Sequence, residues 1–114
     1  MITIEMLRNF GADTEEGLAR CYNNEALYLK LIGMLPNEKN FDNLSAALAA
    51  DDLDAAFEAA HALKGVLGNL SLTPMYEKSS QITELLRERT RMDYTPMLKE
   101  LLDMKERLTA MIND

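Results

Sequence analysis

The sequence has little of what several fold classes and site types require. Its 114 residues include one cysteine, one histidine, no tryptophan and a single valine, Val66. One cysteine excludes an internal disulfide and a cysteine-rich metal cluster, and it fits a reducing, cytoplasmic setting. A chain so poor in valine favours helices over a sheet, because valine prefers strands. The lone Cys21 is therefore expected to be a small, largely buried apolar residue.

Long hydrophobic runs and excess positive charge are also missing. No stretch approaches the roughly 20 apolar residues of a membrane span, and the N-terminal segment, with Glu5 in it, does not read as a signal peptide. Twelve Lys and Arg stand against 19 Asp and Glu, which gives a net charge of −7. Neither a membrane nor nucleic acid is expected as a partner, since nucleic-acid affinity depends on Lys and Arg neutralising phosphates.

What is abundant favours helices. Apolar residues make up 47% of the chain, and most of them are alanine, leucine and methionine, which are good helix formers. Glycine, proline and capping residues divide the chain into segments with helical spacing. Three short helices are expected in residues 2–10, from Asp13 to about Asn23, and in residues 25–35. Four longer helices are expected in residues 40–50, 53–70, 73–90 and 94–112.

Several residues mark where these helices begin. Asp13 and Glu16 have the spacing of a capping box, and Asp51 or Asp52 is placed to cap the helix that starts at Leu53. Thr73 is expected as the N-cap of the next helix, with Pro74 in its first position.

Short loops between long helices make sequential neighbours antiparallel. The fold class we predict is all-α, an antiparallel up-down four-helix bundle over residues 40–113. Short additional N-terminal helices, within residues 1–36, would cover one end or one side of it. The length suits one domain, residues 1–114, and we expect a monomer.

The only histidine lies in the stretch AAHALKGVLGNL, residues 59–70. At about 100° per residue, one apolar stripe collects Leu53, Ala56, Ala60, Leu63 and Leu67. His61 lies roughly 120° from the centre of that stripe, so its imidazole is expected outside the core. Gly65 and Gly68 follow one and two turns later on the same side, although glycine inside a helix costs about 1 kcal/mol relative to alanine. Lys64 lies three residues on, where its ammonium can reach the same patch.

These residues suit phosphoryl transfer. A neutral imidazole nitrogen can attack a phosphoryl group and hold it as a phosphoramidate. A lysine nearby stabilises the charge that spreads over the phosphoryl oxygens. The glycines would allow a second protein that carries the phosphoryl group to approach closely.

The segment HALKGVLGNLSLTPMYEKSSQI resembles the signature of histidine-containing phosphotransfer (HPt) domains. In that signature a lysine follows the histidine by three residues, and glycine, a small residue and a short polar stretch come next. The matching positions here are His61, Lys64, Gly65, Gly68 and Asn69.

The resemblance implies a phosphoryl relay of multistep two-component signalling. His61 would accept a phosphoryl group from an aspartate of a receiver (response regulator) domain and pass it to another, with a hybrid sensor histidine kinase as a further partner. The protein would be a carrier without a cofactor, nucleotide site or autokinase activity. The initial methionine and the lack of a linker make the chain similar to the freestanding form of the family.

One position departs from the family pattern. Many members place Gln or Glu 22 residues after the histidine, where it hydrogen-bonds the ring nitrogen that is not phosphorylated. Thr83 stands there, and Glu84 is the nearer carboxylate, so these two are the candidates for orienting the imidazole. Phe57, at the border of the apolar stripe, and Asn69 are the candidates for docking a receiver.

Other interpretations remain open. Glu58 and His61 form an E-x-x-H pair, but di-iron bundles need two such pairs and further carboxylates, so no metal is expected. The protein could instead be a helical interaction or adaptor module that is never phosphorylated, or a small bundle enzyme with His61 as its base. The run RERTR, residues 87–91, is interpreted as a solvated helix end.

Overall fold

The computed structural model describes residues 1–114, and all its regular structure is helical. The all-α prediction is confirmed, and most helix ends agree with the sequence to within a residue or two. In chain order the elements are α1 (Ile4–Phe10), α2 (Thr14–Arg20), α3 (Glu25–Gly33), the 3₁₀ turn η1 (Leu35–Asn37), α4 (Asn40–Ala49), α5 (Leu53–Asn69), α6 (Thr73–Arg87) and α7 (Thr95–Asn113).

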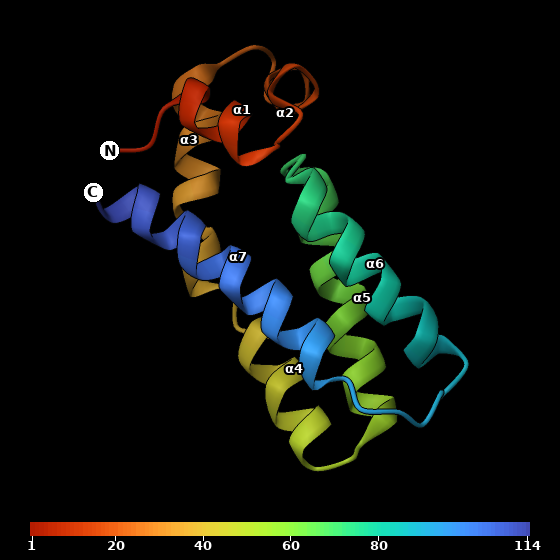
Figure 1. Ribbon diagram of the computed structural model, residues 1–114. Coiled ribbons are helices and arrows are strands. Elements are labelled where there is room, and N and C mark those ends of the chain that lie inside the picture. The colour runs from red at the N-terminus through yellow and green to blue at the C-terminus, as the bar shows by residue number, and fades with distance from the viewer.

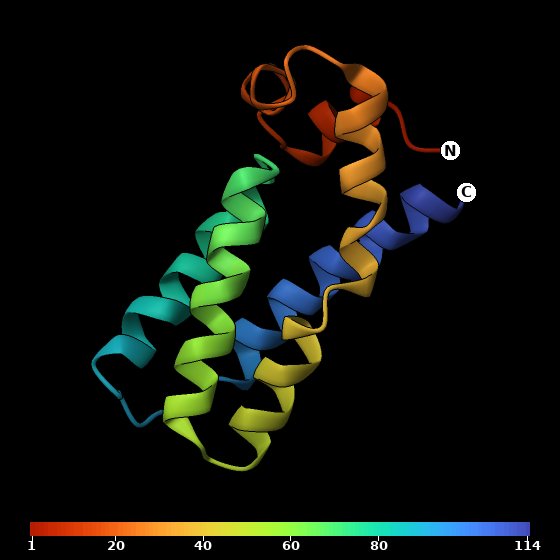
Figure 2. The ribbon, with the colours of Figure 1, turned by 180° about the vertical axis from the view of Figure 1, so that it is seen from behind.

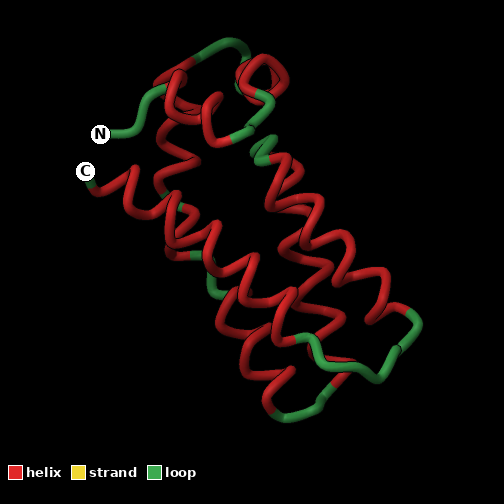
Figure 3. Tube along the Cα trace, in the orientation of Figure 1, coloured by secondary structure: helices red, strands yellow, loops and turns green.

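Helices α4, α5, α6 and α7 run in alternating directions along an elongated body of 41 × 25 × 20 Å (Figure 1). α5 packs against α4 on one side and α6 on the other, and α6 also packs against α7. The connections from α4 to α5 and from α5 to α6 are short, and the connection from α6 to α7 is longer (Figure 3). α1 to α3, which we call the N-terminal cap, gather at the end of the body where α5 ends and α6 begins (Figure 2).

The buried face of α5 is the stripe that helical spacing predicts. Ala56, Ala60, Leu63 and Leu67 are fully buried, and Leu53 at the start of the helix is half-buried. Burying a leucine side chain contributes about 1.5–3 kcal/mol, so this face fixes the rotation of α5 about its axis. Cys21 is buried and unpaired, which confirms its assignment as a small apolar residue.

The predicted helix starts are partly correct. Asp52 caps α5, and its carboxylate accepts a hydrogen bond from the Ala55 amide at 3.1 Å. The prediction that Thr73 is an N-cap is wrong. Thr73 is already the first helical residue of α6, and the cap residue is Leu72, which makes no side-chain capping bond.

α6 ends three residues earlier than predicted, at Arg87 rather than Thr90. Arg89 has the left-handed backbone angle φ 53°, and its guanidinium donates to the Leu86 carbonyl at 2.8 Å. The Leu86 carbonyl at the end of α6 thus accepts from the Arg89 side chain as well as from the Arg89 backbone amide, which donates at 2.9 Å.

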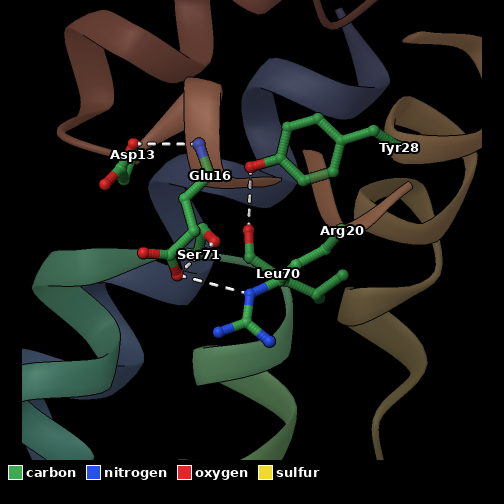
Figure 4. A network of polar contacts seen from close by, with 6 residues as sticks. All are labelled: Asp13, Glu16, Arg20, Tyr28, Leu70 and Ser71. Carbon is green, nitrogen blue, oxygen red and sulfur yellow. Dashed lines mark hydrogen bonds and ion pairs between the residues drawn. The ribbon is translucent and has the colours of Figure 1, made fainter. Parts of the chain in front are cut away.

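The capping box expected at the start of α2 forms only in half. The Asp13 carboxylate accepts from the Glu16 amide at 3.1 Å. In place of the return bond, the Asp13 amide donates to the Ser71 carbonyl at 2.9 Å, and the Ser71 hydroxyl donates to the Glu16 carboxylate at 3.0 Å (Figure 4). The Asp13 amide and the Glu16 carboxylate therefore both attach α2 to the turn between α5 and α6.

Tyr28 of α3 makes a second attachment to the same turn. Its hydroxyl donates to the Leu70 carbonyl at 2.8 Å, and the side chain is fully buried (Figure 4). Burial raises the pKa of Tyr28 to about 12, with the negative charges of Cys21, Asp13 and Glu16 adding to the effect. Gly17 of α2 lies against the Tyr28 ring so closely that a Cβ atom there would overlap it.

Gly17→Ala is expected to lower the free energy of unfolding by about 1–3 kcal/mol, because the added methyl must displace a buried ring. Gly33→Ala is the matched control, since a Cβ atom at Gly33 meets no other atom within 4 Å. Urea unfolding followed by circular dichroism measures both variants. Equal effects of the two substitutions would contradict the close packing of α2 on α3.

The Tyr28 contact also predicts how stability depends on pH. The folded-state pKa of about 12 exceeds the ordinary value of 10.0, so the unfolded chain loses this proton first as the pH rises. The contribution is complete below pH 10 and is lost as the pH rises towards 12. We expect urea unfolding to show a decrease of up to about 2 kcal/mol over this range, and a smaller one in Tyr28→Phe.

Tyr94 is present in both wild type and the Tyr28→Phe variant. Burial raises the pKa of Tyr94 as well, so its contribution at alkaline pH persists in the variant. Superimposable pH profiles for wild type and Tyr28→Phe would show that Tyr28 does not ionise as proposed.

Candidate functional site

A polar groove of about 600 Å³ lies where α2 approaches α5 and the start of α6. Five candidate residues from the sequence meet there. The residues that line the groove are Asp13, Glu16, Arg20, His61, Lys64, Gly65, Gly68, Asn69, Ser71, Thr73 and Tyr76. Its size is that of a ligand or docking cleft.

His61 is exposed, on the side of α5 away from the buried stripe, as helix geometry predicts. Its imidazole stacks on Phe57 one turn earlier, with ring centroids 5.6 Å apart and planes inclined by 18°. No hydrogen bond within the protein engages either ring nitrogen. The ring is thus held by an apolar contact while its nitrogens stay open to a second molecule.

Phe57 is half-buried and contacts more than the imidazole. The guanidinium carbons of Arg87 and Arg89 lie 5.2 and 4.9 Å from its ring centroid. Arg89 also pairs with Asp54 at 2.7 Å. The RERTR run is exposed at the end of α6, as interpreted from the sequence, and two of its arginines also contact Phe57 of α5. A partner approaching Phe57 would meet cations around the ring.

Lys64 and Gly65 lie on the same side of α5 as the imidazole. Lys64 is half-buried and makes no ion pair, so its ammonium is available to an anion in the groove. Gly65 is exposed, and a Cβ atom there would meet nothing within 4 Å. The missing side chain of Gly65 leaves open surface beside the ring and serves no packing contact.

Gly68 and Asn69 occupy the far end of the groove. A Cβ atom at Gly68 would lie 3.1 Å from the Tyr76 ring, so this glycine lets α6 pack closely on α5. Asn69 is exposed and is the last residue of α5. Gly68 therefore has a packing role that its place on the helix face did not predict, in addition to lining the groove.

Neither Thr83 nor Glu84 is hydrogen-bonded to the imidazole. Thr83 is fully buried, and its hydroxyl donates to the Ser79 carbonyl at 2.7 Å. Glu84 is exposed and accepts from Arg87 at 2.8 Å. That hydrogen bond lowers the pKa of Glu84, and the positive charges of Arg87, Lys64 and His61 add to the shift. The contact that orients the ring in this structure is the stack on Phe57.

Sequence reasoning missed the contribution of α2 to the groove. Glu16 and Ser71 are 55 residues apart, and no periodic pattern links residues so distant. The one signal in the sequence is the Asp13–Glu16 spacing, which predicts a local capping box and no contact with α5. No group of three or more His, Cys, Asp or Glu side chains is placed to hold a metal ion, and none of the helices combines the length and apolar character needed to cross a bilayer.

Comparison with known families identifies the family to which the chain belongs. The family model of the Hpt domain matches residues 37–112, which include α4, α5, α6 and all but the last residue of α7. The match covers most of the chain, so the protein belongs to the Hpt domain family, and the resemblance inferred from the sequence is confirmed. The curated proteins and the solved structures gave no match. Hpt domains are phosphocarriers that act with the other components of a phosphorelay.

The two glycines should respond differently to alanine. Gly65→Ala is expected to raise the free energy of unfolding by about 0.5–1 kcal/mol, because alanine favours a helix and the methyl meets open space. Gly68→Ala should raise the free energy of unfolding by less, or lower it, because the added methyl would lie too close to the Tyr76 ring. Urea unfolding of both variants tests this, and a loss of stability in Gly65→Ala would contradict the open surface.

Proposed function

We propose that this protein relays a phosphoryl group between aspartates of receiver domains in multistep two-component signalling, with His61 as the carrier. The observation that carries the proposal is the placement of His61. Its nitrogens are unengaged in a groove that also holds the free ammonium of Lys64 and the open surface at Gly65. Membership of a family of phosphocarriers supports it.

The transfer needs only groups that the groove and a receiver supply. The lone pair of the unprotonated imidazole nitrogen attacks the phosphorus of the receiver's aspartyl phosphate. An N–P bond forms, the O–P bond breaks, and the aspartate leaves as a carboxylate with the electron pair. In the second transfer a carboxylate of another receiver attacks the phosphorus, the N–P bond breaks, and the nitrogen recovers its lone pair.

The neighbours of His61 have distinct roles in this proposal. Lys64 stabilises the negative charge of the phosphoryl oxygens, which is where charge spreads in such transfers. Gly65 allows the receiver's backbone to approach, and Gly68 keeps the Tyr76 ring close to α5. Phe57 holds the imidazole in place by stacking.

The fold serves the relay by leaving this face free. We propose that α4 to α7 form the antiparallel up-down four-helix bundle of the family and that the N-terminal cap belongs to the same domain. His61 is charged with phosphate by partners and not by autophosphorylation.

A labelling experiment tests the proposal. The protein is mixed with radiolabelled receiver domains phosphorylated on aspartate, or with a hybrid kinase and ATP. We expect label that is labile to acid and stable to base, as a phosphohistidine is, and no label on His61→Gln. Lys64→Gln should be labelled more slowly, by roughly tenfold or more. ATP alone should give no label.

Glu58→Gln is the matched control, because it changes an exposed residue one turn before His61. It should be labelled like wild type. Absence of label with every donor in a panel would overturn the relay and favour an interaction module. Label that persists in His61→Gln would place the phosphoryl group elsewhere.

A further inference from the structure

The N-terminal cap forms part of the wall of the groove. The match to the Hpt domain family begins at residue 37, so α1 to α3 lie outside it. Nevertheless Asp13, Glu16 and Arg20 line the same groove as His61 and Lys64. Whatever docks over the imidazole therefore meets residues from α2 as well as from α5.

Hydrogen bonds attach the N-terminal cap to the rest of the molecule beside the groove. Three hydrogen bonds join it to the turn between α5 and α6: Asp13 amide to Ser71 carbonyl, Ser71 hydroxyl to Glu16, and Tyr28 hydroxyl to Leu70 carbonyl. Ser71 is buried and has the left-handed backbone angle φ 56°, so the turn itself has one defined shape. α2 thus has a fixed position beside α5.

Arg20 is oriented within this arrangement. One oxygen of the Glu16 carboxylate accepts both from the Ser71 hydroxyl at 3.0 Å and from Arg20 Nε at 3.3 Å (Figure 4). A guanidinium carries five N–H donors, and no other hydrogen bond engages those of Arg20. The side chain is half-exposed, so its terminal nitrogens are free to bind an anionic group.

We propose that Arg20 is a docking and specificity residue that binds a carboxylate of the receiver domain while that domain covers His61. This inference rests on the proposed function. The planar guanidinium matches a carboxylate in two parallel hydrogen bonds. In this proposal Lys64 stabilises the phosphoryl group, and Arg20 binds the surface of the receiver domain. Glu16 is a positioning residue that orients the guanidinium.

Transfer kinetics with two kinds of phosphodonor test the role of Arg20. A receiver domain phosphorylated by acetyl phosphate needs a docking surface, whereas phosphoramidate is a small donor that reaches His61 without one. In Arg20→Ala we expect the receiver concentration that gives half-maximal transfer to rise roughly tenfold, as for loss of a charge-assisted contact. The maximal rate and the labelling by phosphoramidate should stay within about twofold of wild type.

Two further variants refine the test. Arg20→Lys should recover part of the affinity, and Arg20→Glu should weaken docking more than Arg20→Ala does. Arg8→Ala, which removes an exposed cation of α1 outside the groove, is the matched control and should behave as wild type. Circular dichroism should show unchanged helix content in all variants.

The outcomes are distinguishable. If Arg20→Ala accepts phosphate from receivers as wild type does, the docking role is overturned while the relay stands. If labelling by phosphoramidate falls in parallel, Arg20 acts on the phosphoryl group itself, which also overturns the docking role. If neither donor labels wild type at His61, the proposed function fails and this inference with it.

Discussion

The packing of one face of α5 against α4 and α6 is the constraint on which the site depends. Ala56, Ala60, Leu63 and Leu67 are buried along this face, and a helix so anchored cannot rotate without exposing them. Its opposite face is therefore fixed towards water, and His61, Lys64 and Gly65 keep spacings set by the helix itself. Side chains grouped on one face of a rigid helix need no loop to bring them together. The core determines the geometry of the site although no core residue is part of it.

Much of this could be predicted from the sequence, because helical periodicity is a local signal. The apolar stripe of α5 and the exposure of His61 follow from residue spacing alone. The Thr-Pro pair predicts an N-cap at Thr73 because threonine often precedes a proline in the first helical position, whereas Leu72 is the N-cap residue of α6. The fold of Arg87 and Arg89 over Phe57 and the attachment of α2 to Ser71 depend on contacts between distant segments. Such contacts have no periodic signature, so only the structure revealed them.

The site also shows how local charge differs from net charge. The chain carries −7 overall, yet Lys64 and Arg20 line the groove while Arg87 and Arg89 lie over Phe57 beside it. Paired acids such as Glu84 and Asp54 hold two of these arginines in place. Asp13 and Glu16 also line the groove, so its acids and bases are equal in number, and Lys64 is the cation among these that has no acidic partner.

The two ends of the chain meet on this structure, and the Met1 amine contacts the carbonyl of Asp114 (Figure 1). A domain whose ends adjoin can be joined head to tail, or inserted into a surface loop of another protein, without stretching any helix. The groove is built from α2, α5 and the start of α6 and uses no residue at either end. Joining the two ends, or attaching other chain to them, would therefore leave the residues that line the groove unchanged.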